Sequence, residues 1–105
     1  MYSLEKLEAY QDAMIVGEKI CAIVEGWNFF QKDTIGKQLV RSADSIAANI
    51  SEGYGRFFYK ESVVFYYYSR GSLMETITWI TKAKDLSLIH ISEPTRLRRI
   101  SYAVF

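Results

Sequence analysis

The chain contains very little proline, cysteine and histidine. Its 105 residues include one of each. So little proline, in a composition that is 50% hydrophobic, favours helices over a sandwich of short strands. No metal site can be assembled from a lone cysteine and a lone histidine, and packing on a helical stripe explains Cys21 without redox chemistry. We therefore expect an all-α protein with no metal and no cofactor.

Long hydrophobic runs are also lacking. No stretch approaches the roughly twenty apolar residues that a membrane-spanning helix needs. Residues 1–8 contain no basic segment followed by an apolar block, which is the pattern of a secretory signal. The sequence therefore predicts a cytoplasmic protein with no membrane partner, and its length allows a single modest core.

An excess of positive charge is absent as well. The whole chain has 13 basic and 12 acidic residues and a net charge of +1. Without Arg96, Arg98, Arg99 and Glu93, which lie near the end of the sequence, 10 basic and 11 acidic residues remain. The composition therefore does not show the strongly basic surface that is typical of nucleic-acid-binding domains.

The residue patterns of enzymes are missing too. The sequence has no nucleophile paired with a histidine, no cluster of metal ligands and no glycine-rich phosphate loop after a strand. Glu52 and Glu75 are the one candidate carboxylate pair, and the neighbouring Arg41 and Arg56 favour ion pairing over acid–base chemistry. We therefore predict that the protein is not an enzyme.

What the sequence does contain is helical periodicity. Apolar residues at spacings of three and four predict helices over residues 3–25, 34–54 and 59–85. The short connection between the second and third makes them antiparallel neighbours. The expected N-caps are Ser3 for the first helix and Asp33 or Thr34 for the second. These helices predict an antiparallel up-and-down bundle.

The apolar stripe of each helix indicates the face that we expect to be buried. On the first helix the stripe consists of Leu7, Tyr10, Ala13, Met14, Gly17, Ile20, Cys21 and Val24. On the second it consists of Ile35, Leu39, Ser42, Ile46, Asn49 or Ile50, and Gly53. On the third it consists of Phe65, Ser69, Leu73, Thr76, Ile80 and Ala83. The three consecutive tyrosines 66–68 span most of a helix's circumference, so at least one ring should be exposed.

Small and polar residues are concentrated in the stretches 41–56 and 70–75. Small side chains let two backbones approach closely, so the second and third helices should form the tightest pair. We expect Gly71 to lie at that contact and Gly36 to lie away from it.

Antiparallel pairing of these two helices also brings polar side chains together. It places Arg41 near Glu75, Ser45 near Ser72, and Asn49 near Ser69. The predicted structural polar layer consists of Arg41, Ser45, Asn49, Glu52, Ser72 and Glu75. Buried polar groups of this kind can fix the register of a bundle. The alternative is a catalytic or ligand-binding role.

From about Leu86 the sequence changes character. The run Leu-Ser-Leu-Ile-His-Ile-Ser-Glu-Pro-Thr-Arg at 86–96 resembles one reading frame of the transposase adapter used to prepare DNA sequencing libraries. Pro94 confines any helix in this segment to positions at or after it. We therefore divide the chain into a helical bundle domain, 1–86, and an adapter-derived tail, 87–105. The alternative is a genuine divergent C-terminus with a short strand and a short helix.

A family resemblance lies in three motifs: Ser45-Ile-Ala-Ala-Asn-Ile-Ser-Glu-Gly-Tyr-Gly-Arg56, Gly71-Ser-Leu-Met-Glu75 and Ala83-Lys-Asp-Leu86. They resemble the small bacterial four-helix-bundle proteins encoded in intervening sequences of 23S ribosomal RNA genes, to which the accessory proteins of diversity-generating retroelements are similar. The resemblance covers roughly residues 4–86. It implies a four-helix bundle whose fourth helix is missing or replaced here, and it implies no catalytic activity.

Resemblance to the retroelement accessory proteins further implies a homo-oligomer, namely a pentameric ring that engages RNA or DNA and a reverse transcriptase. The candidate phosphate contacts are the basic residues in or beside the matching motifs: Lys37, Arg56, Lys60 and Arg70. The alternative for these residues is a solvated surface balanced by nearby acidic side chains. For the whole protein, the alternative is a structural or adaptor bundle that mediates protein–protein contacts without binding nucleic acid.

Overall fold

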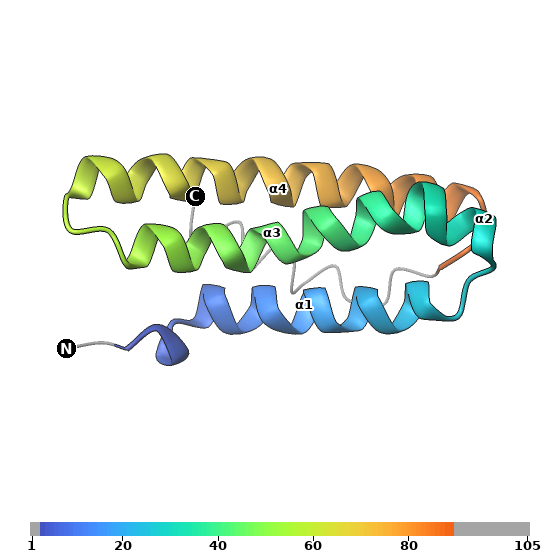
Figure 1. Cartoon of the computed structure of the whole chain (residues 1–105), viewed down its shortest axis with the longest axis horizontal. Coiled ribbons are helices and arrows are strands. Elements are labelled where there is room, and N and C mark those ends of the chain that lie inside the picture. Colours follow the sequence, from blue (N-terminus) through green and yellow to red (C-terminus); the bar gives the residue numbers. More distant parts are fainter. Residues whose placement is uncertain (1–2, 90–105) are drawn as a thin grey trace.

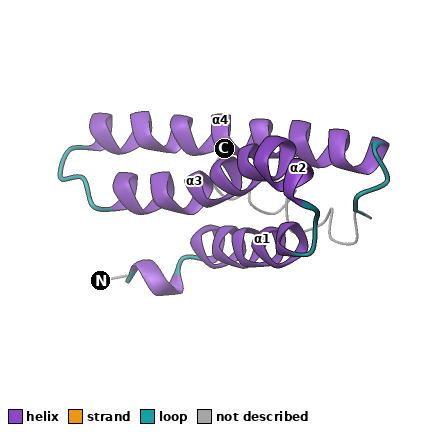
Figure 2. Ribbon diagram, turned by 45° about the vertical axis from the view of Figure 1, so that its right-hand side comes forward, coloured by secondary structure: helices purple, strands orange, loops and turns teal. Residues whose placement is uncertain are grey.

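The computed structural model describes residues 3–89, and the regular elements of this part are all helices. In chain order they are a 3-10 helix η1 (Leu4–Lys6), α1 (Glu8–Glu25), the single turn α2 (Phe29–Gln31), the π-helical segment η2 (Lys32–Gly36), α3 (Lys37–Tyr54) and α4 (Tyr59–Asp85). The three long helices alternate in direction, and α3 lies between α1 and α4 (Figure 1). Figure 2 shows the described part without a strand. The predicted all-α, up-and-down bundle is confirmed.

The first predicted helix is divided in two. Leu7 adopts an extended backbone conformation (φ -75°, ψ 115°) between η1 and α1. The Gln11 side-chain amide spans this break and donates a hydrogen bond to the Glu5 carbonyl at 2.6 Å. Ser3 therefore precedes η1 rather than capping a helix that runs unbroken to Glu25, and it makes no side-chain cap bond.

The second helical path begins earlier than the predicted cap. The Asn28 side chain accepts a hydrogen bond from the Gln31 backbone amide at 2.9 Å, so Asn28 is the N-cap and the helix starts at α2. The Thr34 hydroxyl donates instead to the Phe30 carbonyl at 2.8 Å. Asparagine is among the favoured N-cap residues. The predicted caps Asp33 and Thr34 were wrong because the helical path already includes residues 29–36.

The segment η2 joins α2 and α3 without interrupting the path. The Lys37 amide bonds to the Lys32 carbonyl five residues earlier, which is the π-helical pattern. This wide turn places one more residue in the helical path from Phe29 to Tyr54 than an α-helical turn would.

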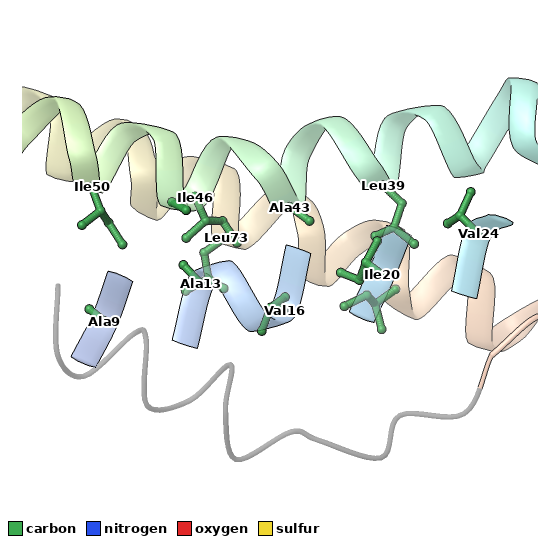
Figure 3. Close-up of a cluster of buried hydrophobic side chains, with 12 residues drawn as sticks. Ala9, Ala13, Val16, Ile20, Val24, Leu39, Ala43, Ile46, Ile50 and Leu73 are labelled. Carbon is green, nitrogen blue, oxygen red and sulfur yellow. The ribbon is translucent and has the colours of Figure 1, made fainter. Parts of the chain in front are cut away.

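The buried face of α1 is shifted from the predicted stripe. It is formed by Ala9, Ala13, Val16, Ile20 and Val24, which pack beneath α3 and α4 (Figure 3). Met14 is 40% exposed, and Cys21 is exposed as well. Packing therefore does not explain Cys21, contrary to the prediction. Apolar residues occur around most of the circumference of α1, so their spacing alone fits more than one choice of buried face.

The pair α3–α4 contains the most extensive helix–helix contact of the described part. On α3 the predicted stripe is buried, with Ile50 rather than Asn49 as its inner member. On α4 the stripe is buried from Ser69 onward, and Phe65 is half-buried. Full burial of a side chain such as Leu73 contributes about 1.5–3 kcal/mol. The predicted exposure within the tyrosine run is also confirmed, because Tyr67 and Tyr68 are exposed.

The glycine expected at the helix contact is the wrong one. A Cβ placed on Gly71 would meet nothing within 4 Å, because this residue is exposed on α4. A Cβ on Gly36 would lie 2.7 Å from Val24 Cγ1 and 3.4 Å from Trp27 Cε3. A close approach that requires glycine therefore occurs where η2 meets the end of α1. Between α3 and α4 such an approach occurs at Gly53 rather than at Gly71, because a Cβ on Gly53 would lie 2.6 Å from Tyr66 Cε1 and 3.0 Å from the Ser62 carbonyl oxygen.

The chain just after α4 packs on the bundle. The Leu88 amide bonds to the Ala83 carbonyl at 2.9 Å, and the half-buried Ile89 contacts the core cluster. These residues belong to the segment that the sequence assigned to an adapter-derived tail. Residues 90–105 of that segment, including His90 and Pro94, lie outside the described residues.

Among the helices of residues 3–89, no segment combines the length and the apolar character that a membrane span requires.

Candidate functional site

The turn between α3 and α4 carries a cluster of cationic and aromatic side chains, which we call the aromatic turn (residues 56–60). At its start the Arg56 guanidinium forms an ion pair with Glu52, one helical turn earlier, at 3.2 Å. The same guanidinium lies over the Phe65 ring, 4.4 Å from its centroid. Phe65 in turn makes an edge-to-face contact with Tyr68 at 5.6 Å. Arg56 is therefore held in place by an ion pair and a cation–π contact together.

The aromatic residues of this turn point away from the core. Phe57 is 91% exposed and Tyr59 is 81% exposed, and Phe58 lies between them with most of its side chain accessible. The Phe57 and Phe58 rings contact each other edge to face at 5.0 Å. Adjacent exposed aromatics of this size commonly mark an interaction surface, whereas singly scattered ones do not. Figure 1 places this turn at the end of the bundle from which α1 starts.

The four candidate phosphate contacts do not form one patch. Arg56 and Lys60 share the aromatic turn, whereas Lys37 lies at the opposite end of α3. The rise of an α-helix places these ends roughly 25 Å apart. Arg70 lies near the middle of α4, is exposed, and already takes part in an interaction. The structure thus brings together two of the four residues.

The predicted polar layer is replaced by hydrogen bonds along the helix surfaces. Arg41 donates to Gln38 at 2.8 Å, and Glu75 accepts from the Trp79 indole at 3.0 Å, so the expected Arg41–Glu75 pair is not formed. Ser45 donates to the Arg41 carbonyl at 2.8 Å and Asn49 to the Ser45 carbonyl at 2.9 Å. Glu52 pairs with Arg56, and the Ser72 carbonyl accepts from Thr76 at 2.7 Å.

The polar contacts that do connect α3 and α4 involve other residues. The hydroxyls of Ser42 and Thr76 are hydrogen-bonded at 3.0 Å, and the Ser69 hydroxyl donates to the Ile46 carbonyl at 2.8 Å. All three side chains are buried. The two helices are antiparallel as predicted, but α3 makes its polar contacts to α4 through positions 42 and 46, on the predicted stripe, rather than through positions 41, 45 and 49. The signal was available, because Ser42, Ser69 and Thr76 already lay on the predicted stripes.

A second feature is a groove of about 470 Å³ between α1 and α3. Its lining includes the small residues Ala13, Gly17 and Ala47, together with the carboxylates Glu18 and Asp44. A Cβ on Gly17 would lie 2.8 Å from Asp44 Oδ1, so this glycine makes room for the carboxylate. Desolvation by the neighbouring helix raises the pKa of Asp44 above its ordinary value. No sequence motif indicated this groove, because it depends on which face of α1 packs on α3.

The side chains gathered at these two sites are aromatic rings, cations and carboxylates. Within residues 3–89 no three histidine, cysteine or carboxylate side chains are grouped so that they could hold a metal ion. Burial, and secondarily the nearby Tyr54, raise the pKa of Tyr66 above its ordinary value. What the described surface offers is exposed aromatic area, cations beside it, and an acidic groove.

Comparison with known proteins identifies one family. No curated protein matches the chain significantly. The family model for the 23S rRNA-intervening sequence protein matches residues 5–102, which is well over half of the chain and includes most of the segment after α4. The chain therefore belongs to the 23S rRNA-intervening sequence protein family.

Proposed function

We propose that this protein is a non-catalytic helical bundle that works by self-association. The observation that carries the proposal is the aromatic turn, where Phe57, Phe58 and Tyr59 are all exposed next to one another. Aromatic side chains are enriched at the centres of protein interfaces because they bury much area for little conformational entropy. The near-neutral composition, with a net charge of +1, also permits close contact between copies without strong repulsion.

The test is the mass of the intact chain in solution, measured by sedimentation velocity across a range of concentrations. We expect an oligomer that Phe57→Ser with Tyr59→Ser shifts toward monomer. The matched control is Phe29→Ser with Phe30→Ser, which removes two exposed aromatics from the opposite end of the bundle. A monomer at every concentration would contradict the proposal. The measured mass also tests the pentamer that the family resemblance implies.

A second candidate function is binding of single-stranded nucleic acid by the assembled oligomer. It is favoured by one specific arrangement, namely the cations of Arg56 and Lys60 beside exposed aromatic rings. Stacking of bases on aromatics next to phosphate-binding cations is the usual basis of single-strand recognition. Repetition around a closed ring would turn a modest local patch into a continuous one.

This second candidate predicts a steep salt dependence. Affinity for RNA or DNA should fall with salt according to the number of phosphates neutralised. Lys60→Gln should reduce that slope, whereas Lys37→Gln at the other end should not. Absence of binding by a confirmed oligomer at low salt would favour the structural or adaptor role, in which a protein such as a reverse transcriptase is the partner.

A further inference from the structure

We propose that the groove between α1 and α3 receives the aromatic turn of a second copy of this chain, so that copies join head to tail. This inference rests on the self-association proposed above and assigns its two contact surfaces. The first is the groove, about 470 Å³ in volume, which is within the range of sites that enclose small ligands or side chains. Its small lining residues, such as Ala13, Gly17 and Ala47, allow large side chains to enter.

Charge distinguishes this groove from an ordinary gap between helices. Its carboxylates, Glu18 and Asp44, have no ion pair or side-chain hydrogen bond with any residue in the range 3–89. Asp44 is also partly desolvated by the packing of α1 on α3, which raises its pKa. A cation brought to the groove by a partner would therefore interact with a carboxylate that has no ion pair with another residue of the described part.

The aromatic turn provides the complementary chemistry. Phe57 and Tyr59 are the most exposed aromatic residues at that end of the bundle, and Lys60 follows them directly. Lys60 has no ion pair with another described residue. Apolar rings flanked by a free ammonium group match a groove with an apolar lining and two free carboxylates. Apolar area and charge thus point to the same occupant.

The two surfaces lie at different places on one molecule, which determines the type of assembly. The groove runs along the flank of α1 and α3, whereas the turn lies beyond the end of α3. The chain's own aromatic turn does not fill the groove, since its rings remain exposed. A contact between two unlike surfaces is heterologous, and repetition of it produces a closed ring or an open filament rather than a simple two-fold dimer.

The single cysteine makes a direct test possible. Cys21 lines the groove and is exposed. In the variant Phe57→Cys, a short bis-maleimide should join position 57 of one copy to Cys21 of the next and give a ladder of crosslinked multimers. Cys21 lies beside Val40 of α3. About 14 residues of α3, or roughly 20 Å, separate Val40 from the end of this helix, where the aromatic turn begins. A short bis-maleimide therefore cannot join position 57 to Cys21 of the same chain.

Two controls decide the outcome. The variant Phe57→Cys with Cys21→Ser should lose the ladder and give at most dimers. Phe29→Cys with native Cys21, at an equally accessible aromatic position, should not give the ladder. An equal ladder from Phe29→Cys, or one that persists without Cys21, would overturn the head-to-tail contact, as would an oligomer in which Phe57→Cys gives no ladder.

A charge test addresses the same contact without crosslinking. Asp44→Asn and Lys60→Gln should each weaken association, by up to about fivefold for a partly exposed pair. The double variant should lose less affinity than the product of the two single losses, because both substitutions remove the same interaction. Strictly independent effects would count against the pairing. A wild-type monomer at all concentrations defeats the proposed function itself, whereas an oligomer insensitive to all these changes defeats only this assignment.

Discussion

The pair α3–α4 and the helix α1 differ in how they are joined to the rest of the bundle. Helices α3 and α4 bury one narrow stripe each and are connected by hydrogen bonds between buried hydroxyl and carbonyl groups. Helix α1 packs through small and β-branched side chains, and its remaining apolar residues, such as Met14 and Ile23, stay exposed. Helix α3 has one apolar face and therefore one way to pack, and its hydrogen bonds with Ser69 and Thr76 select the matching face of α4. Helix α1 is apolar around most of its circumference and has several ways to pack.

Replacement of a core side chain should show the largest difference between these two regions. We expect Leu73→Ala on α4 to lower the free energy of unfolding by about 2–5 kcal/mol, because it leaves a cavity in a fully packed site. Met14→Ala on α1 should cost much less, since Met14 is 40% exposed. Chemical denaturation at a concentration where the protein is monomeric measures both. Equal losses would mean that α1 packs through the stripe predicted from the sequence.

The next largest effect concerns the two glycines. Gly36→Leu should cost about 1–3 kcal/mol through overpacking against Val24 and Trp27. Gly71→Leu, at an exposed position with free space around it, should be neutral or slightly stabilising, because leucine has the higher helix propensity. Thermal unfolding of the two variants checks this. A lower melting temperature for Gly71→Leu than for Gly36→Leu would restore the contact that the sequence predicted between α3 and α4.

The buried hydroxyls allow a finer test of the α3–α4 pair. Thr76→Val keeps the volume of the side chain but removes its hydrogen bonds to Ser42 and Ser72, and we expect a loss of about 0.5–1.5 kcal/mol. Thr78→Val is the matched control, because the Thr78 hydroxyl is exposed and bonds only within its own helix. Similar losses for both variants would indicate that the bond between the helices contributes little.

The smallest expected effect is on pH dependence and involves the α1–α3 side. The pKa of Asp44 is raised in the folded state, so the folded protein binds this proton more tightly than the unfolded chain does. Its contribution to stability is therefore present at low pH and is lost as the pH rises through the raised pKa. Asp44→Asn should flatten the pH dependence of unfolding over this interval. A steeper fall of stability toward acid in the wild type than in Asp44→Asn would reverse the sign and contradict the desolvation.

The sequence was sufficient for the architecture of the α3–α4 pair but not for its polar contacts. The stripe from Leu39 to Gly53 was correct because mostly polar or small residues flank it. The stripe from Ser69 to Ala83 was correct although the apolar residues Met74 and Ile77 flank it and are exposed. The polar layer was displaced by one residue because small side chains such as Ala43 and Ser45 are equally compatible with a buried or an exposed position. For α1, burial of Ala9 and Val16 in place of Met14 and Cys21 is determined by the opposing helix.

The candidate site was only partly accessible to prediction for a related reason. Arg56 and Lys60 share the aromatic turn because they are close in sequence, whereas the separation of Lys37 and Arg70 from them follows from the lengths of α3 and α4. The exposure of Phe57 and Tyr59 was not predicted, since aromatic residues near a helix end fit equally well over a core or in solvent. The groove between α1 and α3 could not be predicted at all, because it depends on the rotation of α1.

The π-helical segment Lys32–Gly36 has a consequence for how the length of this protein can vary. A single-residue deletion inside α3 would rotate every later side chain by about 100° and turn the buried stripe out of the core. The same deletion within η2 would convert one wide turn into an ordinary α-helical turn and leave α3 in phase with α1 and α4. We therefore expect a chain that lacks the exposed Thr34 to fold, and one that lacks Asp44 to fail, as circular dichroism and thermal unfolding would show. In evolutionary terms, η2 is a position at which insertions and deletions are tolerated within an otherwise fixed helical frame.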